Sequence, residues 1–336
     1  MYKHIIKPLL FSLDAERAHH FTMDTLRIVQ SIPGALFVIN QLYGVKARSE
    51  MSVDLGGVHF PNPVGLAAGL DKNGQALPAF STMGFGFMEV GTVTPKAQPG
   101  NEQPRMFRLP EDLALINRMG FNNKGTDALV ERLRNFRKII PIAVNIGKNK
   151  ITPNDQAEKD YRECIRSLYD YGDLFVVNIS SPNTLDLRSL QHGNELKGLL
   201  DAVMDEMKLQ QTKPGTSLGR PKPVFVKLAP DLTDTQLDDT LGIIVESGVF
   251  GVIAANTTVD RTGIKHKHAL EMGGLSGKPL GTRSTEMIRR IYRLTQGKLP
   301  IIGSGGIFSS EDAYGKIRAG ASLVEIFTAM IYHGPG

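Results

Sequence analysis

Residues that could do chemistry, through a polar side chain or an exposed glycine backbone, recur in this chain at one kind of place, the end of a short apolar segment. They are Lys72, Thr92, Asn145, Asn178, Lys227, Asn256, Gly305, Gly306 and Thr328. Two more amides, Asn117 and Asn183, lie in the connecting segments. The asparagines offer neutral donors and acceptors, and the two lysines add positive charge. This set suits a planar anion, rich in amide groups, that lies on a flavin.

The elements that must position these residues are eight short apolar runs rich in β-branched residues. They span 63–69, 87–94, 141–147, 174–180, 223–230, 251–258, 300–307 and 323–330. Such runs are too continuously apolar for a sheet with one wet face, so they predict buried parallel strands. Helical stretches at 155–171, 234–246 and 282–295 alternate with them. We therefore expect an α/β fold, a closed (β/α)8 TIM barrel, with its chemistry at the C-terminal strand ends.

A phosphate site is predicted where the seventh and eighth strands end. The seventh strand leads into a glycine-rich turn, 303–306, and Ser309 or Ser310 should cap the following helix. A second glycine-rich segment, 273–277, could form another wall of this corner. Neither a Walker lysine-serine pair nor a strand-linked GxGxxG is present, which argues against NTPase and Rossmann readings.

The N-terminal segment predicts two amphipathic helices outside the barrel. The first has apolar residues at helical spacing with basic residues between them: Ile5, Ile6, Leu9, Leu10 and Leu13, with Lys3, His4 and Lys7. The second should begin at Asp14 as its N-cap, with Ala18, Phe21, Thr25 and Val29 on one face and Glu16, His20, Asp24 and Arg27 opposite. These helices either anchor the protein on a membrane surface or pack on the main domain.

The expected domain organisation is a helical extension at 1–45 and a barrel at 46–336. The chain reaches Gly336 directly after the eighth predicted strand, so we expect no final barrel helix. No apolar run approaches the ~20 residues that span a bilayer, and no signal-peptide pattern is present, so the sequence predicts neither a transmembrane nor an exported protein.

Composition excludes several classes of site. The 39 Lys and Arg against 34 Asp and Glu give a net charge of +5, which suits phosphate-bearing ligands or an anionic membrane but is too small to indicate nucleic acid. A single cysteine, Cys164, excludes an intramolecular disulfide and multi-thiolate or iron–sulfur sites. His266 and His268 lie in a charged loop without carboxylates at ligand spacing, so we expect no metal.

Nine motifs carry a resemblance to a known family. In order they are GLAAGLDK (65–72), GTVTP (91–95), QPG (98–100), NRMGFN (117–122), NIGKN (145–149), NISSPNT (178–184), KLAP (227–230), NTT (256–258) and GGLSG (273–277). From about Asp14 onward the chain resembles the class 2, quinone-dependent dihydroorotate dehydrogenases. The resemblance implies oxidation of (S)-dihydroorotate to orotate with bound FMN, and electron transfer to a membrane quinone, in de novo pyrimidine (UMP) synthesis.

Roles follow from this resemblance for residues that match the family's motifs. Ser181 would be the base that removes the C5 proton while a hydride leaves C6 for the flavin, with Thr184 in the proton relay. Class 1 enzymes have a cysteine at that loop position, whereas Cys164 lies in a helical stretch upstream. Lys227 would place positive charge beside the flavin's pyrimidine edge.

The resemblance also implies three sets of binding residues. Substrate contacts would come from Lys72, Asn117, Arg118, Met119, Gly120, Phe121, Asn178, Asn183, Asn256 and Thr257. FMN contacts would come from Ala68, Gly69, Leu70, Asp71, Lys72, Thr92, Asn145, Asn178, Lys227, Ala255, Gly277, Gly306, Phe327 and Thr328. The quinone path would pass His19 and Arg108.

The family's location would make the protein peripheral to the cytoplasmic side of a bacterial inner membrane; no mitochondrial targeting segment is recognisable in the sequence. Ala255, Phe327 and the pair Leu185 and Asp186 depart from the family's usual threonine, tyrosine and Pro-Gly.

Three other functions fit the pattern less well. A tRNA dihydrouridine synthase would need an active-site cysteine and a basic C-terminal helical domain, and a class 1 enzyme would lack the N-terminal helices. A non-redox phosphate-binding barrel attached to membranes would purify without flavin colour.

Overall fold

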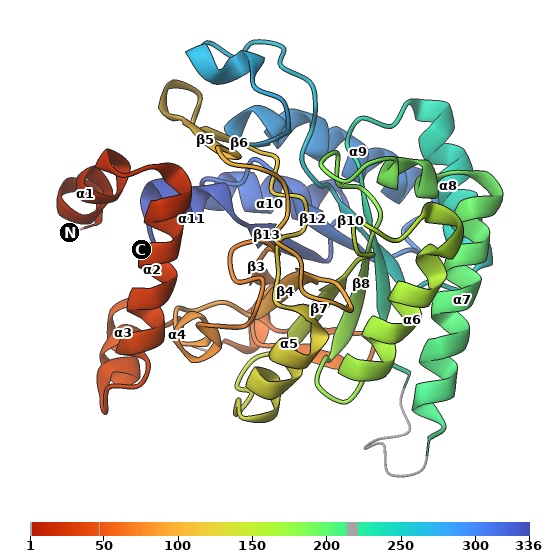
Figure 1. The fold of residues 1–336 in the computed structure, drawn as a ribbon, viewed down its shortest axis with the longest axis horizontal. Helices are drawn as coiled ribbons and strands as arrows, with labels where there is room; N and C mark the ends of the chain where they lie inside the picture. The colour runs from red at the N-terminus through yellow and green to blue at the C-terminus, as the bar shows by residue number, and fades with distance from the viewer. Residues whose placement is uncertain (1, 47, 214–220) are drawn as a thin grey trace.

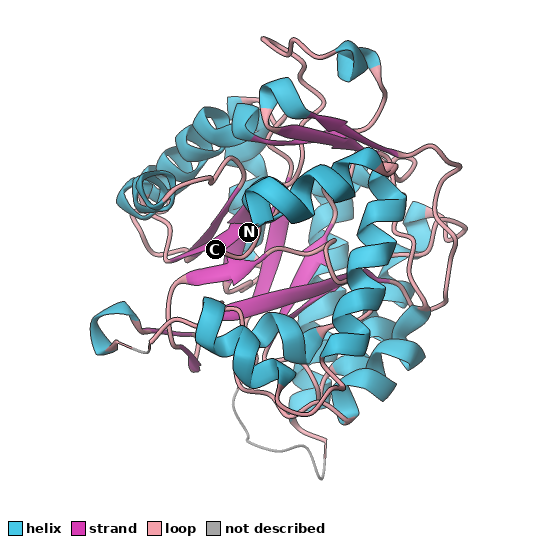
Figure 2. Ribbon diagram, turned by 90° about the vertical axis from the view of Figure 1, so that its left-hand side faces the viewer, coloured by secondary structure: helices cyan, strands magenta, loops and turns pink. Residues whose placement is uncertain are grey.

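A closed barrel of eight parallel strands forms the centre of the computed structural model, which describes residues 2–46, 48–213 and 221–336 (Figures 1 and 2). The strands are β3 (Val64–Leu66), β4 (Phe87–Val93), β7 (Ile142–Ile146), β8 (Leu174–Asn178), β9 (Val224–Leu228), β10 (Gly251–Ala254), β12 (Ile301–Ser304) and β13 (Leu323–Ile326). Each lies within one of the eight predicted runs. The predicted α/β TIM barrel is thus confirmed.

The barrel floor is a small apolar cluster closed by a hairpin. Strands β1 (Val53–Leu55) and β2 (Val58–Phe60) pair antiparallel, and they pack with Phe87, Leu174 and Phe225. The rings of Phe60 and Phe87 meet edge to face at 5.4 Å. Because this end is filled with apolar side chains, the polar strand residues gather at the other end.

Helices surround the barrel. They are α4 (Leu77–Ser81), α5 (Gly125–Arg134), α6 (Ala157–Leu168), α7 (Gly193–Gln211), α8 (Asp234–Glu246), α9 (Gly281–Leu294), α10 (Ser310–Ala319) and α11 (Thr328–His333). Helices α6, α8 and α9 correspond to the three predicted helical stretches. Short 3-10 turns connect the elements at Ser49–Met51, Pro110–Asp112, Asn154–Gln156, Leu187–Gln191, Lys267–Leu270 and Lys278–Leu280.

One prediction fails after the eighth strand. We expected a strand to residue 330 and no helix beyond it, but β13 ends at Ile326 and the six-residue helix α11 follows. Tertiary contacts hold this turn: Tyr332 Oη donates to the Ala114 carbonyl at 2.8 Å, and Tyr2 Oη donates to the Ile331 carbonyl at 2.6 Å. The two ends of the chain consequently lie side by side in both views (Figures 1 and 2).

A three-stranded antiparallel sheet, which no sequence pattern predicted, adds a cap to the molecule. Strand β6 (Ala114–Asn117) pairs with β5 (Met106–Leu109) on one side and with β11 (Gly274–Gly277) on the other. This pairing brings Asn117 opposite Gly274 although they are far apart in sequence. The motifs NRMGFN (117–122) and GGLSG (273–277) therefore lie side by side.

The N-terminal helices are a π-helical turn (Tyr2–Ile6), α1 (Lys7–Ser12), α2 (Ala15–Val29) and α3 (Ala35–Tyr43), seen in red to orange in Figure 1. Asp14 is the N-cap of α2, as predicted, and its carboxylate accepts from Glu16 N at 2.9 Å and Arg17 N at 3.1 Å.

The predicted faces of α2 are wrong in part. Glu16, expected opposite the packed face, is buried and pairs with Arg105 of the barrel at 2.7 Å, because that guanidinium is itself buried. Phe21, expected on the packed face, is 56% exposed. Ala18 and Met23 do pack inward, and the Gln30 side-chain amide donates to the Gln75 carbonyl at 2.8 Å.

Many apolar side chains of this extension are nonetheless exposed. They are Ile5, Leu9, Leu13, Phe21, Ile28, Ile32, Phe37, Val38, Leu42 and Val45. The helices therefore pack on the barrel, one of the two alternatives left open by the sequence, and they also present an exposed apolar surface. No described helix is long and apolar enough to cross a bilayer.

Candidate active site

One pocket opens at the C-terminal ends of the barrel strands, beneath the cap sheet. Its wall contains most of the residues that the sequence predicted for substrate and cofactor: Ala68, Gly69, Lys72, Thr92, Asn117, Met119, Gly120, Phe121, Asn178, Ser181, Asn183, Lys227, Ala255, Asn256, Thr257, Gly277, Gly306, Phe327 and Thr328. Residues from seven strand ends and from the cap sheet thus meet at a single cavity.

Four of the predicted residues, Leu70, Asp71, Arg118 and Asn145, are not part of that wall. The Asp71 carboxylate accepts from Gln75 N and Ala76 N, each at 2.7 Å, and so fixes the turn into α4; burial raises its pKa. Arg118 pairs with Glu271 at 2.7 Å. Asn145 is fully buried, and its side-chain oxygen accepts hydrogen bonds from Thr92 and Asn178, which do line the pocket.

A network of buried amides and hydroxyls orients the polar wall. Asn178 Nδ2 donates to Thr92 Oγ1 at 2.8 Å and lies 3.2 Å from Asn145 Oδ1. Asn145 Nδ2 in turn donates to Glu89 Oε1 at 2.6 Å. Because each group has a partner, the amides that face the pocket have defined donor and acceptor directions.

Two buried carboxyls, on Glu89 and Glu325, are functional groups that the sequence pattern did not single out. Glu89 lies on β4 and Glu325 on β13, and both face Lys227 of β9. Lys227 Nζ is 2.7 Å from Glu89 Oε2 and 3.6 Å from Glu325 Oε2. An acid inside an otherwise apolar strand was the signal that could have found them.

The charges of this cluster follow from burial and proximity. Burial raises the pKa of Glu325, and the neighbouring Glu89 carboxylate raises it further, well above its usual range. Burial also acts to raise the pKa of Glu89, but the Lys227 ammonium and hydrogen bonds from Asn145 and Ala68 N outweigh it. The two carboxyls overcome the effect of burial on Lys227 and raise its pKa. These shifts together favour an ammonium on Lys227, a carboxylate on Glu89 and a proton on Glu325.

Ser181 lies on the loop after β8, in the pocket wall and 6% exposed. Its Oγ accepts from Asn183 N at 3.2 Å. On the same loop, Thr184 Oγ1 is buried without a hydrogen-bond partner among the described residues. The neighbouring Ser180 hydroxyl accepts from Asn256 Nδ2 at 2.9 Å, which connects this loop to the one after β10.

Lys72 supplies a second cation to the pocket. Burial, with the charge of Arg105, lowers its pKa to about 8. On α2, burial together with the charge of Lys72 lowers the pKa of His19 to about 3, so this imidazole is neutral at physiological pH. Arg108 lies on β5, where its Nη1 donates to the Leu10 carbonyl at 3.0 Å. The two residues predicted for a quinone path therefore lie on or against the helical extension.

The segments from which a phosphate site was predicted meet in the pocket. Gly277 of β11, Gly306 after β12 and Thr328 after β13 all line the pocket, and Thr328 Oγ1 donates to Ser276 Oγ at 2.9 Å. A Cβ on Gly306 would lie 2.1 Å from the Gly281 Cα, so only glycine fits. Ser309 caps α10 and accepts from Asp312 N at 3.2 Å.

No three His, Cys, Asp or Glu side chains of the described residues are grouped so as to hold a metal ion.

The comparisons agree with this geometry. The family described as dihydroorotate dehydrogenase matches residues 50–336. A dihydroorotate dehydrogenase (quinone) of Deinococcus deserti is 52% identical over 100% of this chain and 92% of its own length. One from Christiangramia forsetii is 52% identical over 100% and 96%. The crystal structure of an Eimeria tenella DHODH in complex with ferulenol superimposes with a TM-score of 0.87 at 40% identity, covering 97% of this chain and 91% of that one.

Proposed function

The chain belongs to the dihydroorotate dehydrogenase family, and we propose that it oxidises (S)-dihydroorotate to orotate and passes the two electrons to a quinone. The observation that carries the proposal is that four asparagines, two lysines and Ser181 line one pocket. Relatives that share about half of the sequence over the whole chain are named as the quinone-dependent enzyme.

The residues of this pocket fit FMN. Neither Glu325 carboxyl oxygen has a hydrogen-bond partner among the described residues, although the residue lines the pocket, so a polar ligand edge can satisfy it. Lys227 offers positive charge beside it, and the Gly277, Gly306 and Thr328 corner suits a phosphate. FMN, when bound, supplies the acceptor for the hydride that leaves C6.

The asparagines would bind the pyrimidine ring. Asn117 and Asn183 approach each other, with Asn183 Nδ2 3.4 Å from Asn117 Oδ1, while Asn256 lines the pocket beside Asn178. Amides can donate to carbonyls and accept from ring N–H groups, and Lys72 supplies charge for the carboxylate. These groups would hold the substrate with its C5 and C6 hydrogens in fixed directions.

Ser181 would remove the C5 proton. A serine hydroxyl is a weak base at neutral pH, so the proton must be passed on as it is taken. The buried Thr184 hydroxyl on the same loop has a free hydrogen-bonding capacity among the described residues and would serve as the next member of the relay. Burial of this loop excludes water from the transfer.

The exposed apolar surface of the N-terminal helices would bind the membrane, on the cytoplasmic side of a bacterial inner membrane. Phe37 and Leu42 are 67% and 64% exposed, and Lys3, Lys7 and Lys46 lie in the same segment. Apolar insertion combined with lysines favours an anionic bilayer. A quinone arriving from it would pass His19 and Arg108 toward the pocket.

The test is anaerobic stopped-flow reduction of the flavin by dihydroorotate in Ser181→Ala. Losing a general base should slow reduction by ~10²-fold or more, with flavin content and orotate binding nearly unchanged. Ser247→Ala, which removes another buried hydroxyl without a partner among the described residues, is the matched control and should react like the parent. A parent-like rate in Ser181→Ala would remove Ser181 from this role.

A further inference from the structure

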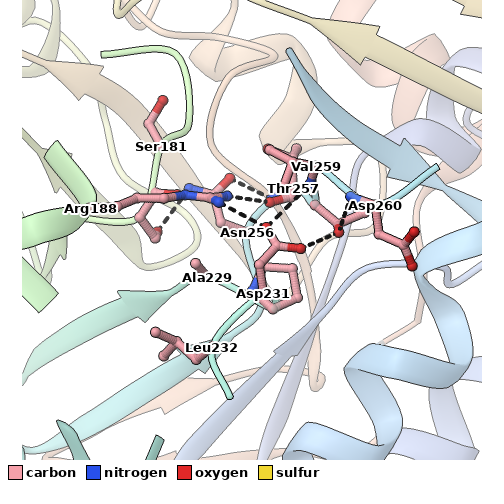
Figure 3. Close-up of polar contacts among 12 residues, drawn as sticks. Ser181, Arg188, Ala229, Asp231, Leu232, Asn256, Thr257, Val259 and Asp260 are labelled. Atoms are coloured by element: carbon pink, nitrogen blue, oxygen red, sulfur yellow. Dashed lines mark hydrogen bonds and ion pairs between the residues drawn. The ribbon is translucent and has the colours of Figure 1, made fainter. Parts of the chain in front are cut away.

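Arg188 connects the loops that carry Ser181 and Asn256, assigned to proton removal and pyrimidine binding, with the loop after β9. It lies in the 3-10 turn Leu187–Gln191, which follows the Ser181 loop. Its Nε donates to the Ser180 carbonyl at 3.1 Å, and its Nη2 donates to the Thr257 carbonyl at 3.1 Å (Figure 3). Its Nη1 lies 2.9 Å from Asp231 Oδ2, in the loop after β9. Each guanidinium nitrogen therefore serves a different loop.

The two carbonyls that Arg188 binds are adjacent to functional side chains. Ser180 directly precedes Ser181, and Thr257 directly follows Asn256. A guanidinium is planar, and its donors point in fixed directions, so it sets the distance between these two backbone groups. The side chain is 24% exposed, and these charge-assisted bonds are thus partly shielded from water.

Asp231 is held on its other side by the loop after β10. The Thr258 hydroxyl donates to Asp231 Oδ1, and Val259 N donates to Asp231 Oδ2 at 3.2 Å. Asp260 N donates to the Thr258 hydroxyl at 3.0 Å, which continues the network seen in Figure 3. Asp231 is 20% exposed, and among the ion pairs of the described residues it pairs with Arg188 alone. It therefore anchors the guanidinium that binds the two carbonyls.

Neither Arg188 nor Asp231 belongs to the pocket wall. We propose that Arg188, anchored by Asp231, is a positioning residue that holds the Ser181 loop at a fixed distance from the Asn256 loop, and so aligns the base with C5 of the bound pyrimidine. This inference rests on the proposed function. It predicts that loosening the bridge impairs proton removal far more than it impairs binding.

The test compares Arg188→Gln and Arg188→Lys with the parent in anaerobic flavin reduction by dihydroorotate. A misplacement of about 1 Å is worth ~10²-fold in rate, so both variants should be slowed by ~10-fold or more. The dissociation constant of orotate, read from the flavin spectrum, should change less than about 3-fold, because several asparagine side chains share the binding and none of them is replaced. Arg188→Lys should fail to rescue the rate, because an ammonium cannot reproduce the planar fork.

Isotope effects separate positioning from general destabilisation. With dihydroorotate deuterated at C5 or at C6, the C5 effect on reduction should increase in both variants relative to the C6 effect, because proton removal becomes slower than hydride transfer. Arg290→Gln is the matched control: Arg290 is 30% exposed and pairs with Asp234 at 2.9 Å and Asp238 at 2.8 Å on the outer helices. It should leave the rate and both isotope effects unchanged.

A reduction rate within twofold of the parent in Arg188→Gln, or a slow rate with an unchanged C5 effect, would overturn the proposal. Where the Arg188 variants lose flavin on purification, Asp231→Asn loosens the anchor while keeping the two carbonyl bonds. It should raise the C5 effect in the same sense, and an unchanged effect there would also overturn the proposal. Failure of dihydroorotate to reduce the parent flavin would instead refute the proposed function itself.

Discussion

Replacing Glu325 with glutamine should make the protein more stable at neutral pH. In the folded chain this carboxyl is buried, faces Glu89 and Lys227, and has its pKa raised well above the usual 4.5. In the unfolded chain it ionises near 4.5, so folding at higher pH must take up a proton. Glutamine is neutral at every pH and close in shape, and it needs no proton.

The sign and size follow from linkage. Because the folded pKa is raised, the stability contributed by Glu325 is complete below about pH 4.5 and is lost as pH rises toward the folded pKa. Each pH unit between the unfolded and the folded pKa of Glu325 is worth ~1.4 kcal/mol, so the stability advantage of the variant should grow with pH across that range. An unfolding entropy of ~2.1 cal/mol/K per residue over 336 residues converts each ~1.4 kcal/mol to a rise of ~2 °C in Tm.

Thermal unfolding at pH 5.0, 6.5 and 8.0 would measure the difference, which should grow with pH. Glu89→Gln is the contrasting variant, since it removes the carboxylate 2.7 Å from Lys227 and should destabilise by ~3–5 kcal/mol. Flavin content is measured in each sample so that equal occupancy is compared. A Glu325→Gln variant with a Tm equal to or below the parent's, and no dependence of the difference on pH, would refute the assignment of a protonated acid.

Three further outcomes are expected. Orotate binding should weaken by up to tenfold per pH unit above about pH 8, because Lys72 of the ligand-free protein loses its proton there. In fluorescence titrations, Lys72→Met should abolish this dependence of orotate affinity on pH. Lys227→Met should bind FMN at least ~10-fold more weakly, because Glu89 is left buried without a cation. The control Lys316→Met changes another buried lysine, on α10, and should keep its flavin in gel filtration. Phe37→Asp with Leu42→Asp should lower binding to anionic vesicles by ~10-fold or more in flotation assays, with flavin reduction by dihydroorotate unchanged.

The barrel and its strand-end residues could be predicted because their signals are local. Each apolar run ends in a polar residue within a few positions, so the amino-acid pattern alone places Asn145, Asn178 and Lys227 near strand ends. Gly277 and Gly306 could be placed at the pocket for the same reason, because each lies next to a strand end.

Pairings between distant segments could not be predicted. Strand β6 pairs with β11 although about 160 residues separate them, and each has only four residues, too few for a periodic signal. Glu16 looked like a solvent-facing residue because the buried cation that pairs with it, Arg105, lies 89 positions away. The Arg188 bridge is of the same kind, since its acceptors are backbone carbonyls that no side-chain pattern reveals.

The ion pair between Glu89 and Lys227 also bears on the order of folding. Its partners are 138 positions apart, on strands that are not neighbours in the barrel, because β7 and β8 lie between β4 and β9. The pair therefore forms only when these four strands have assembled around the interior. A partial barrel without β9 would leave the Glu89 carboxylate without its cation, against an apolar interior. The buried ion pair therefore favours structures in which β4 and β9 are assembled together over structures that lack one of them, and so couples the folding of distant segments of the chain.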